Sequence, residues 1–227
     1  MTPAHVFFIP SVFFLGLLVG AIATARFQRA APATPHSGSA QVTGKTSARS
    51  VVLAFIVFAV VFAATHLSPQ FGGAKAITVA MHGMPILDQR PSFSSADVYA
   101  RLDAFGPVGR GMYQRFTYSV DVVFPLSLLI FLSLLARFVT QRTGLNAGWR
   151  PILLALPFAW FISDMLENAM VFSLIANFPI QNDLLGGIVG YVTAVKFSLL
   201  LLSIAVPAVC LVVLQRGATA RSTIPGA

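Results

Sequence analysis

The sequence predicts an all-α membrane protein with five transmembrane helices: a tethered N-terminal span, then a four-helix body with an outer amphipathic helix. Hydrophobic residues make up 56% of the 227 positions and charged residues only 10%, and the mean hydropathy is +0.81. Soluble chains carry roughly a quarter charged residues. The 22 charged side chains, 15 Lys and Arg with 7 Asp and Glu, are too few to cover a soluble globule. The high apolar content also excludes disorder for most of the chain.

Five apolar segments are long enough to span a bilayer. A hydrocarbon core of ~30 Å needs about 20 helical residues, and a backbone in lipid must satisfy its own hydrogen bonds, which favours helices. The alternating pattern of a membrane β-barrel is absent. The predicted spans are residues 6–25, 51–67, 118–139, 151–178 and 184–214.

The basic residues between these spans predict the orientation, because cytoplasmic connections are rich in Lys and Arg. The connections on one side carry nine basic residues without an acid, whereas the other side carries five mixed with acids in one long loop. We therefore expect a multi-pass protein of the cell (inner) membrane with its N terminus outside and its C terminus cytoplasmic. This excess of Lys and Arg on one side explains the net charge of +8, so a nucleic-acid partner is not expected. The bilayer is the expected partner, and a homo-oligomer stays open. The nine residues are Arg26, Arg29, Lys45, Arg49, Arg137, Arg142, Arg150, Arg216 and Arg221.

Composition divides the chain into four parts. The second part is rich in Ala, Pro, Ser, Thr and Gly, which is typical of a flexible linker. The first span could instead be a cleaved signal peptide, since small residues follow its apolar stretch, but basic residues lie after the stretch and not before it. A retained anchor is favoured. The expected parts are an N-terminal transmembrane anchor (1–27), a flexible cytoplasmic linker (28–50), a four-span body (51–216) that includes the outer loop 68–117, and a cytoplasmic tail (217–227).

A short amphipathic helix is predicted inside the outer loop. Ser94 or Ser95 can cap its N terminus, and Gly106 with Pro107 ends it. We expect it to lie on the membrane or across the outer mouth of the bundle. The apolar residues at helical spacing between these signals are Val98, Leu102 and Phe105.

The segment after this helix leads Arg110, Tyr113 and Arg115 to the third span. These residues are either interfacial anchors or an electropositive outer rim that captures an anionic headgroup or substrate.

Thioether and imidazole groups occur together at Met81, His82 and Met84. Such ligands suit copper(I), but two Met and one His in a loop are a weak signal. We assign no metal to the chain on this basis, and the cofactors are left unknown.

Besides Arg137 at the cytoplasmic end of the third span, four ionisable residues fall inside the predicted spans, where charges are costly and mark functional sites. At a rise of 1.5 Å per residue, Asp164 lies at the middle of its segment, and Glu167 and Lys196 lie about 4 to 5 Å outward of the middle of theirs. Glu167 and Lys196 are therefore the expected ion pair. Asp121 lies about 11 Å outward in the third span.

Pro125 follows Asp121 by four residues in the third span. Pro125 lacks the N–H that would bond the Asp121 carbonyl, which leaves that carbonyl free and kinks the helix. Arg110 and Arg115 are within reach of the carboxylate. A cation, a proton or a substrate hydroxyl could bind here, although a kink alone also explains the pattern.

The fourth span carries a polar stripe, because Asp164, Glu167 and Asn168 are spaced i, i+3, i+4 and share one face. In the fifth span Thr193 lies near the face of Lys196.

Glycines in the fifth span are expected to bring it close to the fourth. Gly186 and Gly190 form a small-xxx-small surface that permits close helix approach, so that Lys196 can reach the carboxylates.

The three carboxylates in the spans outnumber the single lysine. If all ionised, a net charge of minus two would lie in a low dielectric, so at least one acid should carry a proton or hold a cation. We expect this to be Asp164, which lies deepest. The alternative is that the ion pair only fastens helices together.

Four short motifs resemble a pattern in small bacterial multispanning membrane proteins of unassigned function. They are GPVGRGMY (106–113), DVVFP (121–125), DMLEN (164–168) and TAVK (193–196), written generally as GxxGRxxY, DxxFP, DxxEN and TxxK. The resemblance covers about residues 95–200 and implies no activity, but it supports this choice of site.

Three functions fit these observations. The first is a membrane protein whose buried Asp/Glu/Lys site binds or transports a small polar ligand or protons. The second is a membrane-embedded enzyme that acts on a lipid headgroup, and the third is a structural or assembly subunit. Whether the chain is an enzyme stays open, since it contains no HExxH, GxSxG or P-loop signature. The expected site comprises Asp121, Asp164, Glu167, Asn168, Lys196 and Thr193.

Overall fold

The computed structural model describes residues 45–68, 73–143 and 148–222, with side chains up to residue 211. The chain divides into two units, Met1–Thr46 and Ser47–Ala227, and the fold below is that of the second. The predicted span 6–25 and most of the linker 28–50 lie outside the described residues.

Every regular element in the described ranges is a helix, which agrees with the predicted all-α class. Ser47 begins the first of them, since its side chain accepts a hydrogen bond from the Ser50 amide; the linker therefore ends before residue 50. The elements are α2 (Ala48–Phe62), the π-helix η1 (Ala63–Leu67), α3 (Ala74–Ala80), α4 (Ser95–Ala104), α5 (Gly106–Thr117), α6 (Val120–Thr140), α7 (Trp149–Asn177) and α8 (Asp183–Ser222).

Within the described residues, four helical stretches are long and apolar enough to cross a membrane. They agree with the second to fifth predicted spans, with two differences. The stretch that contains α6 begins earlier, because α5 leads directly into it, and α8 continues to Ser222, past the predicted end of the body. The stretches are Ala48–Leu67, Gly106–Thr140, Trp149–Asn177 and Asp183–Leu211.

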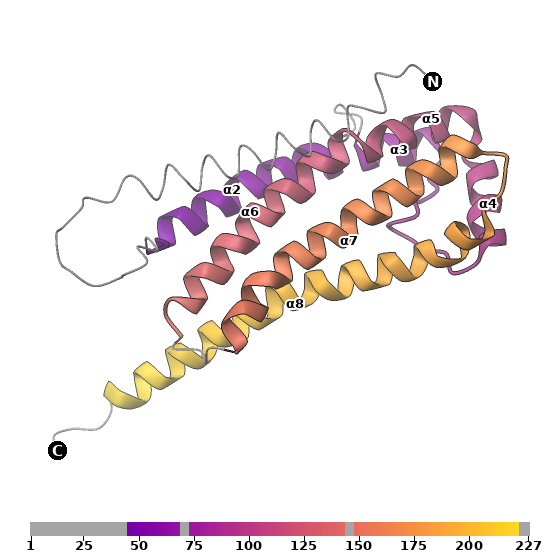
Figure 1. The fold of residues 1–227 in the computed structure, drawn as a ribbon. Coiled ribbons are helices and arrows are strands. Elements are labelled where there is room, and N and C mark those ends of the chain that lie inside the picture. The colour runs from indigo at the N-terminus through magenta and orange to yellow at the C-terminus, as the bar shows by residue number, and fades with distance from the viewer. Residues whose placement is uncertain (1–44, 69–72, 144–147, 223–227) are drawn as a thin grey trace, which may run out of the picture. The chain divides into compact units, whose positions relative to one another are not determined.

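The long helices pack in chain order, α2 against α6, α6 against α7 and α7 against α8, and α6 also touches α8 (Figure 1). Helix α2 leaves most of its apolar side chains exposed, among them Val52, Leu53 and Ile56. An exposed apolar helix suits lipid and not water.

Residues 73–105, here called the cap, lie at one end of the long helices (Figure 1). The cap comprises α3, a loop and α4, and α4 packs on α8. The predicted capping signal is confirmed, because the Ser94 side chain accepts from the Asp97 amide at 3.2 Å. The buried apolar face of α4 joins residues of α5, α7 and α8 in one core. The cap therefore packs on the bundle as folded protein. Its central apolar residues are Ile77, Met81, Leu87, Val98 and Leu102.

Candidate functional site

A buried lysine on α8 contacts three carboxylates. The Lys196 Nζ lies 2.9 Å from Asp88 Oδ2 and 3.2 Å from Asp164 Oδ1, and it also pairs with Glu167. The predicted pairing of Glu167 with Lys196 is thus confirmed, and Asp164 and Asp88 join it. These four residues are called the Lys196 cluster below.

Helices α7 and α8 place the cluster near their centres. Asp164 and Lys196 each lie one residue from the middle of their candidate spans. Glu167 is fully buried, and only 5% of the Lys196 side chain is exposed. Thr193, one turn from Lys196, donates a hydrogen bond to Glu167. Asp164 and Glu167 of the polar stripe predicted on α7 therefore face the polar side of α8.

Asp88 comes from the cap and is a member of the site that the sequence did not indicate. Its carboxylate binds Lys196 through Oδ2, and its Oδ1 accepts a hydrogen bond from the Tyr113 hydroxyl at 2.9 Å. The same hydroxyl accepts from the Leu87 amide at 3.2 Å. Tyr113 was expected at an outer rim, but it is fully buried in the structure. It orients Asp88 toward the lysine.

Arg101 of α4 holds the loop that carries Asp88. Its guanidinium donates to the carbonyls of Pro85 and Ile86 at 2.9 and 3.1 Å and to the Ser92 hydroxyl at 2.7 Å. These bonds satisfy carbonyls that no helix pairs. A single cation therefore fixes the path of the loop into the bundle.

Two glycines of α8 allow the cap to approach. A Cβ at Gly190 would lie 2.2 Å from the Ser92 carbonyl oxygen, and one at Gly186 would lie 3.0 Å from the Ser95 Cα. These glycines were expected to bring α8 close to α7. The structure corrects this, because their close neighbours belong to the cap. The close approach brings the cap, and Asp88 with it, to α8.

The charge of Asp88 depends on the lysine. Burial alone raises the pKa of the Asp88 carboxyl, but the charge and hydrogen bond of Lys196 and the hydrogen bond of Tyr113 outweigh it. The net pKa lies below the ordinary value. The side chain keeps 15% exposure, more than any other member of the cluster. Asp88 is thus an ionised group through which the cluster reaches water.

Asp121 lies beside this cluster on α6. Its backbone carbonyl, which Pro125 leaves without an intrahelical partner, accepts a hydrogen bond from Asn168 Nδ2 at 3.3 Å. This confirms the predicted free carbonyl and links α6 to α7. Neither Arg110 nor Arg115 pairs with the Asp121 carboxylate. Arg110 donates to the Leu102 carbonyl at 2.7 Å, and Arg115 is exposed.

The other predicted residues are not brought together. Arg110 lies over the Phe178 ring at 4.0 Å, so the structure assembles no rim from Arg110, Tyr113 and Arg115. Met81 is fully buried in the core, whereas His82 is exposed. Within the described ranges, no group of three His, Cys, Asp or Glu side chains could hold a metal ion.

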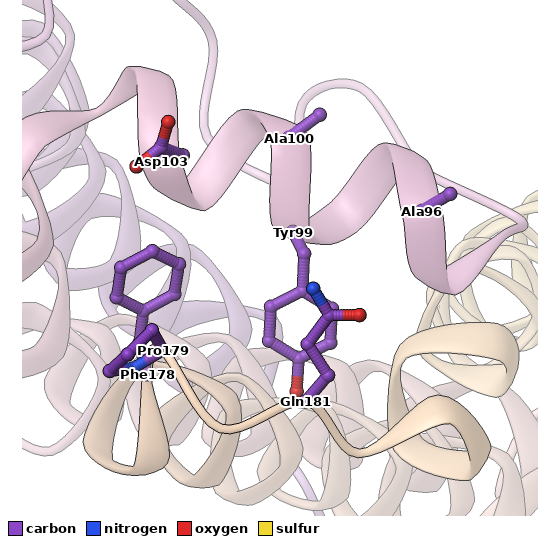
Figure 2. Close-up of a pocket in the computed structure, with 7 residues that line it drawn as sticks. All are labelled: Ala96, Tyr99, Ala100, Asp103, Phe178, Pro179 and Gln181. Carbon is purple, nitrogen blue, oxygen red and sulfur yellow. The ribbon is translucent and has the colours of Figure 1, made fainter.

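A surface hollow of about 410 Å³ lies elsewhere, between α4 and the connection from α7 to α8 (Figure 2). Tyr99 points from α4 toward that connection, where its hydroxyl accepts from the Asn182 amide at 2.6 Å. No member of the Lys196 cluster lines the hollow. Its lining residues are Ala96, Tyr99, Ala100, Asp103, Phe178, Pro179 and Gln181.

In the part of the chain that the structure describes, the fold is all-helical, with four helices long and apolar enough to span a membrane and a buried network of one lysine and several carboxylates. No family model, curated protein or solved structure matches the chain.

Proposed function

We propose that this chain is a membrane protein whose Lys196 cluster binds protons in the middle of the bundle and carries them across the membrane. The observation that carries the proposal is the excess of buried acids. Asp88, Asp164 and Glu167 surround one lysine, and the buried Asp121 lies on the next helix. If all of them ionised, the interior would hold four negative charges against one positive charge.

Such an imbalance is not tolerated at low dielectric, because an unpaired buried charge costs several kcal/mol even after relaxation. Buried groups in this position neutralise instead. Lys196 and Asp88 balance each other, so the remaining carboxyls are the groups that take up protons. Asp164 suits this role because its Oδ2 is buried and has no hydrogen-bond partner.

The contacts also support a path for the proton. Asp88 is the most exposed member, and it touches Lys196, which touches Asp164 and Glu167 in turn. Exchange through such short contacts needs no cavity large enough for an organic ligand. Protons are therefore favoured over a small polar molecule.

The proposal places the protein in the cell membrane with the cap outside and the C terminus in the cytoplasm. This orientation rests on the uneven distribution of Lys and Arg between the connections. Protons would then reach the Lys196 cluster from the outer side, through Asp88.

Proton flux into sealed vesicles tests the proposal. With an internal pH-sensitive dye and an inside-negative potassium diffusion potential, vesicles that contain the wild-type protein should acidify faster than empty vesicles, because the potential draws protons inward. Glu167→Gln should lower the rate toward that of empty vesicles, because the amide keeps the shape but cannot exchange a proton.

The matched control is Asp103→Asn, the same change of acid to amide at an exposed position of α4. It should leave the flux unchanged. A folded wild-type protein whose vesicles are as tight as empty ones would contradict the proposal and favour a purely structural ion pair.

A further inference from the structure

Three buried oxygen atoms on the packed helices α6 and α7 have no hydrogen-bond partner. They are Asp121 Oδ2, Asn168 Oδ1 and Asp164 Oδ2. Each side chain is at least nine-tenths buried. All three atoms are acceptors as ionised carboxylates or amide oxygen, so each of them lacks a donor.

The hydrogen bond between Asn168 and the Asp121 carbonyl fixes the positions of two of these groups. It directs the side-chain amide of Asn168 toward Asp121. Asn168 Oδ1, the oxygen without a partner, is part of this amide group. Asp164 lies one helical turn before Asn168 on the same face of α7. One proton on a carboxyl here supplies the missing donor.

We propose that Asp121 is a second proton-binding group of the site, held as a carboxylic acid at neutral pH with the Asn168 side chain as its acceptor. This rests on the proposed function in so far as it extends the path of protons from the Lys196 cluster. It adds a distinct residue on a third helix. When Asp121 gives up its proton, Asp164 can supply another, and that transfer leaves Asp164 ionised.

A proton fits this place better than a metal ion. One amide and two carboxylates do not by themselves complete the six oxygen ligands of Mg²⁺ or Ca²⁺, so a divalent cation would have to bring water into this buried place. A proton needs only one donor oxygen and one acceptor, and it removes one negative charge from the buried group.

Infrared spectroscopy of the purified full chain at neutral pH tests this inference. The wild type should show carboxylic-acid C=O absorption that shifts in D₂O, and Asp121→Asn should remove the band that belongs to Asp121 while any band from Asp164 or Glu167 stays. Asp103→Asn, the exposed counterpart, should leave the band in place. Asn168→Ala keeps Asp121 but removes its acceptor, so the same band should move to higher frequency.

The Asn168→Ala shift keeps the test decisive even where Asp121→Asn fails to fold. A wild-type spectrum without the band, or a band that neither variant changes, overturns the inference. A sodium-dependent carboxylate band also overturns the inference. Such a band would respond to NaCl but not to choline chloride and would disappear in Asp121→Asn, because a cation would then occupy the site. If proton flux is observed but the Asp121 band is absent, this inference is wrong and the proposed function stands. If the Asp121 band is observed but proton flux is absent, the proposed function is wrong and this inference stands.

Discussion

Replacing Lys196 with methionine should destabilise the protein by about 3–5 kcal/mol at neutral pH, the cost of removing one partner from a buried ion pair. Methionine fills the space of the lysine stem but leaves Asp88, Asp164 and Glu167 without a cation. Unfolding in a denaturing detergent titration measures the change. Lys75→Met, at an exposed position of α3, is the matched control and should change the free energy of unfolding little.

The pH dependence of the same variant gives a second signature. In the wild type the pKa of Asp88 is lowered, so its contribution to stability is complete above the unfolded pKa of about 4 and is lost as the pH falls below it. Without Lys196, burial is the largest influence and outweighs the remaining hydrogen bond from Tyr113, so the pKa of Asp88 rises. The difference in the free energy of unfolding between the wild type and Lys196→Met should then shrink as the pH falls toward about 4. A deficit under about 0.5 kcal/mol at neutral pH, the size of a typical surface substitution, would show that the lysine is not a buried partner.

Gly190→Ala should separate the cap from α8. The new Cβ would lie 2.2 Å from a backbone oxygen of Ser92, and backbone cannot move aside as a flexible side-chain end can. Overpacking of this kind costs about 1–3 kcal/mol. Because Asp88 belongs to the cap, its ion pair with Lys196 should open as well. The readouts are the free energy of unfolding and the rate at which protease cuts the cap loop.

Gly187 offers a control three residues away on the same helix. A Cβ at Gly187 meets nothing within 4 Å, and Gly→Ala at an unstrained helical position stabilises by about 0.4–1 kcal/mol. The two variants should therefore move in opposite directions. If Gly190→Ala and Gly187→Ala have the same stability and the same protease resistance, the cap does not depend on this close approach.

Helical periodicity and depth along the chain made part of the site predictable. Glu167 and Lys196 fall at similar depths in their segments, and the i, i+3, i+4 spacing of the polar stripe places Asn168 beside them. The Pro125 rule indicated a free carbonyl at Asp121. Each of these inferences depends only on the regular geometry of a helix.

The contribution of the cap could not be read in this way. Asp88 lies in a loop, and its position depends on hydrogen bonds from Arg101 to loop carbonyls, which no periodic pattern encodes. The partner of Gly190 was assigned to α7 for the same reason, because a small residue indicates close packing without naming the neighbour. One local signal did exist: Asp88 directly follows the large apolar residues Ile86 and Leu87, which are both buried.

The buried carboxyls outnumber their cation, and we therefore propose that they hold protons in the folded protein. Proton release on unfolding measures this directly, in an unbuffered solution held at neutral pH while the purified protein is denatured. We expect at least about one proton to leave each wild-type chain, because exposed carboxyls ionise at that pH. Asp164→Asn combined with Glu167→Gln should reduce the release. Unfolding of the wild type without proton release would contradict the claim, since every buried carboxyl would then already be ionised beside Lys196.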